Sequence, residues 1–229
     1  MLRPIRSTPI RARILIACAA CCAGAVGLVA PNSTANAAPE PALIPVRWQL
    51  DIQPGPLRLA RVTVDVEVPG PNGTITLVRQ PRTYLYFTYK VVNNTGQDVT
   101  FAPSFELGTD DGDLLRGGRN VPLEVTRTLL ERLQNPFLMD QVSVIGSLGQ
   151  GEENAKEGLV IWEAPSLQVD ELTIFVSGFS GESKRITKPG SAEEVVLRKQ
   201  LMIRHLAPGD LSAFNDQPIP RTEERWILR

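Results

Sequence analysis

Hydrophobic and polar side chains alternate along much of the chain, most clearly in residues 82–115. In this stretch Leu85, Phe87, Tyr89 and Val91 share one parity, and the intervening positions are Tyr84, Tyr86, Thr88 and Lys90. A period of two residues is typical of a β-strand, so the first set is expected to face a core and the second set the opposite side. The parity continues through Val99, Phe101, Phe105 and Leu107 after an Asn-Asn-Thr-Gly turn at 93–96.

Similar short runs, separated by turn residues, predict about nine strands. They cover 47–52, 57–68, 74–78, 84–92, 99–107, 159–163, 171–179, 195–206 and 223–229, and a possible further short strand lies at the start of 140–148. Pro54-Gly55-Pro56 is expected to end the first strand, and 149–158 and 181–194 are expected to be loops. Pro103 suggests an edge position or a bulge. Turn signals at this spacing, without alternating helices, indicate an antiparallel β-sandwich.

One segment has helical rather than strand periodicity. Val125, Leu129, Leu130 and Leu133 recur at helical spacing, and Pro122 suits a first turn. The sequence therefore predicts a single α-helix at about 122–134, with Asn120 as a capping residue and with a position over an open end or edge of the sandwich.

The first 37 residues have the pattern of a secretory signal peptide. Four arginines precede an apolar run at 14–30, and Ala35-Asn36-Ala37 is a cleavage signal, so the mature chain is expected to begin near Ala38. The alternatives are a retained membrane anchor and, at Cys18, a lipoprotein signal. Residues 38–46 are expected to form a linker and residues 47–229 a single domain, with no membrane span after cleavage.

The positions of the cysteines and the net charge further limit the class of protein and its possible partners. The chain contains three cysteines, Cys18, Cys21 and Cys22, all inside the leader, so the mature domain is expected to have no disulfide. An exported domain without cysteine suits a bacterial envelope. Without the four leader arginines the chain carries 20 basic and 25 acidic residues, a net charge of −5. That balance disfavours nucleic acid and anionic lipid as partners.

Three segments in order carry a resemblance: VVNNTGQDVTF, FELGTDDGDLL and EGLVIWEAP. Together they resemble uncharacterised exported bacterial proteins with an immunoglobulin-like β-sandwich, over roughly residues 83–179. The resemblance implies a mainly β, antiparallel immunoglobulin-like fold, here with one inserted helix. It carries no assigned active site, so it implies no functional residue.

Two groups of residues are candidates for ligand binding. Tyr84 and Tyr86 could present an aromatic platform to a sugar or peptide, or could pack beneath a neighbouring segment. Asp110, Asp111 and Asp113 crowd one turn and could hold calcium, although the spacing lacks the glutamate of an EF-hand and also suits an Asp-Gly hairpin turn.

Other residues with reactive or charged side chains favour structural interpretations. His205 is the single histidine and lies outside any nucleophile-elbow motif. Glu152 and Glu153 are adjacent and would point apart on a strand. The basic loop Arg116-Gly117-Gly118-Arg119 could bind an anion or a partner, or could be a solvated connection.

These features favour a secreted or periplasmic, non-enzymatic module with a binding or structural role in the bacterial envelope. Its partner would be an envelope protein or a glycan, and no cofactor or metal is expected. The alternatives are a carbohydrate- or calcium-binding sandwich, and an accessory hydrolase whose carboxylate pair would be assembled by folding.

Overall fold

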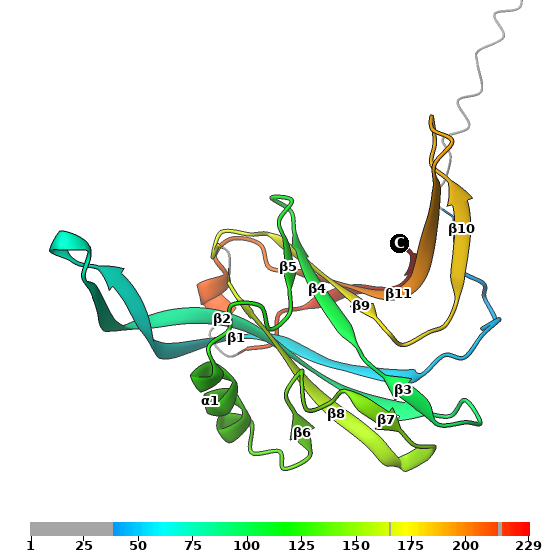
Figure 1. Ribbon diagram of the computed structural model, residues 1–229, viewed down its shortest axis with the longest axis horizontal. Helices are drawn as coiled ribbons and strands as arrows, with labels where there is room; N and C mark the ends of the chain where they lie inside the picture. Colours follow the sequence, from blue (N-terminus) through cyan, green and yellow to red (C-terminus); the bar gives the residue numbers. More distant parts are fainter. Residues whose placement is uncertain (1–38, 165, 215–216) are drawn as a thin grey trace, which may run out of the picture. The chain divides into compact units, whose positions relative to one another are not determined.

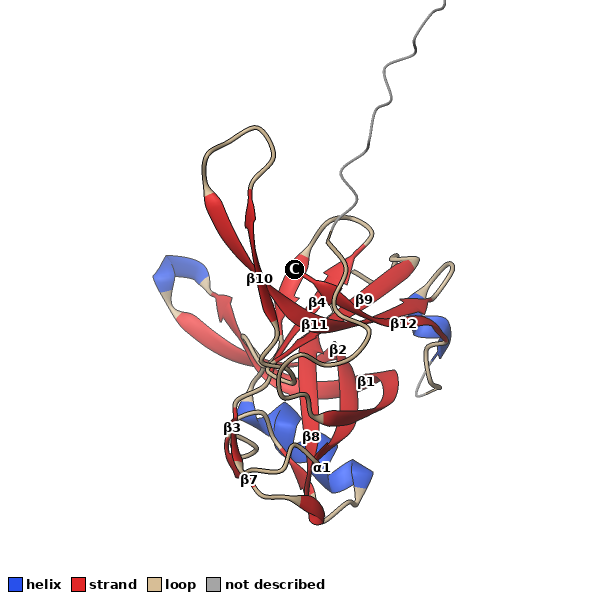
Figure 2. Ribbon diagram, turned by 90° about the vertical axis from the view of Figure 1, so that its right-hand side faces the viewer, coloured by secondary structure: helices blue, strands red, loops and turns tan. Residues whose placement is uncertain are grey.

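The computed structural model describes residues 39–229 except 165 and 215–216, and within them the chain is mainly β with antiparallel sheets and one α-helix (Figures 1 and 2). The expected leader at 1–37 lies outside these residues. The described strands are β1 (Asp51–Pro69), β2 (Ile75–Asn93), β3 (Val99–Phe101), β4 (Ser104–Thr109), β5 (Leu114–Arg116), β6 (Leu138–Met139), β7 (Gly146–Leu148), β8 (Gly151–Glu163), β9 (Glu171–Ser177), β10 (Ser183–Thr187), β11 (Glu194–Leu206) and β12 (Arg221–Leu228). The α-helix is α1 (Leu123–Leu133), and short 3-10 turns lie at Pro71–Gly73 and Leu211–Phe214.

The first sheet has the strand order β1-β2-β8-β6. β1 and β2 form one long hairpin, in register from Asp51 opposite Val92 to Pro69 opposite Ile75. Asn72 and Gly73 have φ values of 70° and 75° at its turn, as expected for an Asn-Gly turn. β8 pairs with β2 only as far as Tyr84 opposite Glu163, so the outer part of the hairpin has two strands.

The second sheet has the order β10-β11-β9-β4-β5, and β12 also pairs with β11, from Lys199 opposite Leu228 to His205 opposite Arg221. β3 lies outside it and pairs with β7. Pro103 falls between β3 and β4, where the chain leaves one pairing and enters another. The expected single strand at 99–107 is thus divided at its proline, which cannot donate a ladder hydrogen bond.

The two sheets face each other around the main hydrophobic core. Leu85, Phe87, Tyr89 and Val91 contribute to it from β2, which confirms the predicted inner face. Phe105 of β4 packs against the rings of Phe87 and Tyr89, with centroids 6.1 and 4.8 Å apart. β9 supplies Leu172, Ile174 and Val176, and β11 supplies Leu201 and Ile203.

A second hydrophobic cluster covers the opposite face of the first sheet. Val125 and Leu129 of α1 are fully buried there against side chains of β1, β2 and β8. The predicted helix bounds are correct to one residue, but its predicted position over an end or edge is wrong, because α1 lies on the sheet face. Asn120 does not cap it: the N-cap residue is Pro122, and no side chain caps the helix.

Several predicted strand limits are also wrong. β1 continues through Pro54-Gly55-Pro56 by a bulge between Pro54 and Leu57, which an edge strand tolerates. Residues 151–158 belong to β8: Gly158 lies opposite Tyr89, and a Cβ at Gly158 would lie 2.3 Å from the Tyr89 ring. The expected loop at 181–194 contains β10. The short strand expected at the start of 140–148 is instead a turn at 141–144, and β7 follows it. No helix among the described residues is long and apolar enough to cross a membrane.

Leu129→Ala should lower the free energy of unfolding by about 2–5 kcal/mol, since it removes a fully buried side chain from the contact between α1 and the sheet. Urea unfolding followed by circular dichroism measures the change. Arg127→Ala, at an exposed position on the same helix, is the control and should change stability by less than about 0.5 kcal/mol. Equal losses in both variants would contradict the helix position.

Candidate functional site

Tyr84 and Tyr86 lie inside the second hydrophobic cluster, where they are 2% and 3% exposed. Burial, with a contribution from the Glu163 carboxylate, raises the pKa of Tyr84 above its usual value, although Arg82 opposes the shift. An aromatic platform needs an open ring face, and neither ring has one. Tyr84 and Tyr86 therefore do not form the candidate platform; both side chains pack beneath α1 and its neighbours.

The acidic turn closes a tight hairpin between β4 and β5. The amide of Thr109 donates to the Asp113 carbonyl at 3.0 Å, and Gly112 has a φ of 91°. Asp110 Oδ2 accepts a hydrogen bond from the amide of Asp170 at 3.2 Å, which ties the turn to the connection before β9. No group of three or more acidic, histidine or cysteine side chains in the described part of the chain is placed to hold a metal, and this includes the candidate calcium ligands Asp110, Asp111 and Asp113.

His205 is buried on β11. Its Nδ1 donates to the Ile219 carbonyl at 3.0 Å, and its Nε2 has no partner among the described residues. Burial lowers the pKa of His205 to about 4, helped by the charge of Arg221 and opposed by the bond to Ile219. The ring is therefore neutral at pH 7, as suits a structural core histidine.

A buried ion pair attaches the N-terminal segment, and the sequence offered no signal for it. Lys199 Nζ lies 2.9 Å from Glu182 Oε2, with the two residues 4% and 7% exposed. Glu182 Oε1 accepts the amide of Ala42 at 2.9 Å. That bond and the Lys199 contact lower the pKa of Glu182. Residues expected to form a linker are thus hydrogen-bonded to the domain.

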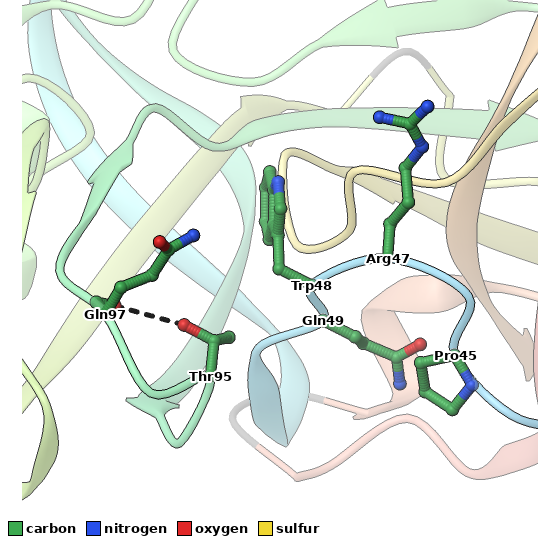
Figure 3. Close-up of a pocket in the computed structure, with 6 residues that line it drawn as sticks. All are labelled: Pro45, Arg47, Trp48, Gln49, Thr95 and Gln97. Carbon is green, nitrogen blue, oxygen red and sulfur yellow. Dashed lines mark hydrogen bonds between the residues drawn. The ribbon is translucent and has the colours of Figure 1, made fainter.

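A shallow depression of about 600 Å³ lies beside this segment (Figure 3). Trp48 and Gln97 line it from two segments, the N-terminal stretch and the connection between β2 and β3. Arg47, Gln49, Thr95 and Pro45 complete the lining. An indole with amide and guanidinium groups at its edge is a combination suited to a polar, neutral ligand.

The outer part of the β1–β2 hairpin, residues 65–80, is called the arm below; it extends away from the paired sheets (Figure 1). Ile75 and Leu77 are 68% and 63% exposed, and Val78 is 39% exposed. Arg79 ties the base of the arm to α1 through Glu124 at 2.9 Å. Within the described part of the chain, each arm strand pairs only with the other, so both outer backbone edges are open.

Glu152 and Glu153 lie in β8, and Glu152 forms an ion pair with Lys90 of β2.

Comparisons of the chain with family models, curated proteins and solved structures found no match.

His205→Asn should flatten the dependence of stability on pH between about 4 and 6.5. Native His205 binds its proton less readily than unfolded His205, so the contribution of His205 to the free energy of unfolding is fully present above pH 6.5 and falls as the pH drops toward 4, by about 3 kcal/mol. Asn keeps a donor for the Ile219 carbonyl but does not titrate. Urea unfolding at several pH values measures the difference, and parallel curves for the two proteins would contradict the assignment.

Proposed function

We propose that the chain is an exported, non-enzymatic binding module of the bacterial envelope, with an immunoglobulin-like sandwich as its scaffold and the arm as its surface for a protein partner. The exposure of Ile75 and Leu77 on an open two-stranded hairpin is the observation that carries the proposal. Exposed apolar groups beside unpaired strand edges favour pairing with another chain.

The scaffold supports this function through its rigidity. Two antiparallel sheets enclose one large core, and the long strands of the arm continue directly from the first sheet. The immunoglobulin-like assignment rests on this two-sheet arrangement together with the segments quoted above. The parallel pairing of β6 with β8 and the helix α1 are departures from a minimal sandwich.

The partner surface can be tested by photo-crosslinking in the envelope of the native host. A photoreactive p-benzoylphenylalanine at Leu77 should give a discrete protein adduct, whereas the same group at Val196, an exposed apolar position on β11, should not. Ile75→Ser should weaken the adduct at Leu77, because it removes neighbouring apolar surface. The same preparation gives the mature N-terminus, which is expected at Ala38. Equal adducts at both positions would contradict a role for the arm.

The second candidate function is binding of a neutral carbohydrate at the Trp48 depression, which Trp48, Gln97 and Arg47 favour together. Calorimetry with chitohexaose and cellohexaose should detect binding that Gln97→Ala and Arg47→Ala each weaken. Arg185→Ala, on β10 and away from the depression, is the matched control. Equal affinity in all variants would contradict this candidate.

A further inference from the structure

The basic loop at Arg116–Arg119, called the clamp loop below, is hydrogen-bonded to both sheets. The amide of Gly117 donates to Phe105 O of β4 at 2.9 Å, and the amide of Gly118 donates to Ile161 O of β8 at 2.7 Å. Gly118 has a φ of 71°, and a Cβ there would lie 1.9 Å from Gln141 Oε1. Glycine is therefore required at this position, and the loop is held rigidly rather than being a solvated connection.

The clamp loop forms one wall of a cleft of about 640 Å³, within the range of small-molecule sites. The cleft draws on both sheets: β2 and β8 contribute from the first, and β4 and β5 from the second. Its lining residues are Arg82, Glu106, Leu114, Leu115, Arg116, Arg119, Asn120, Trp162, Glu163 and Ala164.

The guanidinium groups of the cleft keep unused hydrogen-bonding capacity. Arg82 lies 3.8 Å from Glu163, and Arg116 lies 4.0 Å from Glu106, so both pairs are loose. Glu106 is bound more closely by Arg229, at 2.6 Å. The side chain of Arg119 has no partner among the described residues. Each guanidinium offers five N–H donors, which suit a planar oxyanion.

The cleft is also lined by an exposed apolar side chain, Leu114, and by Trp162, whose indole N–H makes no hydrogen bond to the described residues. Leu114 is 48% exposed beside the arginines. Trp162 is 1% exposed, and its buried Nε1–H has no hydrogen-bond acceptor in the described part of the chain.

We propose that this cleft binds a small organic carboxylate, with Arg116 and Arg119 as donors to the carboxylate and with Leu114 against an apolar part of the ligand. A single negative charge is favoured over a phosphate dianion, because Glu106 and Glu163 line the same cleft and repel additional charge. The site is separate from the arm and does not depend on the function proposed for it.

Calorimetry on the full chain tests the proposal with 3-phenylpropionate, acetate and inorganic phosphate. We expect 3-phenylpropionate to bind most tightly, and Arg116→Gln with Arg119→Gln to weaken it about tenfold. The matched control is Arg127→Gln with Arg198→Gln, two exposed arginines outside the cleft, which makes the same change in net charge and should leave affinity unchanged.

The opposite results overturn the proposal in distinguishable ways. Tighter binding of phosphate would show that the cleft prefers phosphate to a carboxylate. Equal binding of acetate and 3-phenylpropionate would contradict the proposed apolar contact. No binding at millimolar concentration, or an equal loss of affinity in the cleft and control variants, would contradict a binding site in this cleft.

A second measurement uses the wild-type sequence and does not depend on the folding of an arginine variant. Of the three tryptophan indole N–H signals in a nitrogen–proton spectrum, only that of Trp162 should move substantially when 3-phenylpropionate is added. The signal that disappears in Trp162→Phe identifies it. A shift confined to Trp48 or Trp226 would contradict binding in this cleft.

Discussion

The structure depends on the burial of one strand on both of its faces. The inner side chains of β2 enter the main core, and Tyr84 and Tyr86 on its other face enter the second cluster. A strand that is apolar on both sides needs two covers, and the chain supplies the second sheet on one side and α1 on the other. The tyrosines are therefore best understood as the contact surface for α1.

Hydrogen bonds through loops join the layers that this burial brings together. The clamp loop donates one amide to each sheet. Asn93, which is fully buried at the end of β2, donates to the carbonyls of Gln97 and Leu148 at 2.9 Å and accepts the amide and hydroxyl of Thr95. A buried amide with all these contacts satisfied stabilises one loop conformation, because any rearrangement would leave polar atoms unpaired.

Periodicity predicted the features that depend on local pattern. It predicted the two faces of β2 and the bounds of α1, because each follows from side chains a few residues apart. The polar half of β8 could not be recognised in this way. Its charged side chains are mostly exposed or half-buried, and its conformation comes from pairing with a distant strand and from the space that Gly158 leaves for Tyr89.

The candidate sites were harder to predict, because they combine residues that are far apart in the chain. The buried pair of Glu182 with Lys199 depends on strands that only the fold aligns. Asp110, a candidate calcium ligand, accepts a backbone hydrogen bond from Asp170 instead. The clamp loop showed a compositional signal, two glycines between two arginines, but the sequence favoured a solvated connection there, because its hydrogen bonds to β4 and β8 depend on the fold.

The arm is one part of the domain whose exposed apolar side chains the core does not explain. An isolated two-stranded hairpin is marginally stable in water, and the arm is supported mainly by continuity with the first sheet and by Arg79 at its base. Ile75 and Leu77 contribute little to folding at their exposure, while they increase the risk of aggregation on an open edge. A surface that costs solubility without stabilising the fold is most simply explained by a partner that covers it.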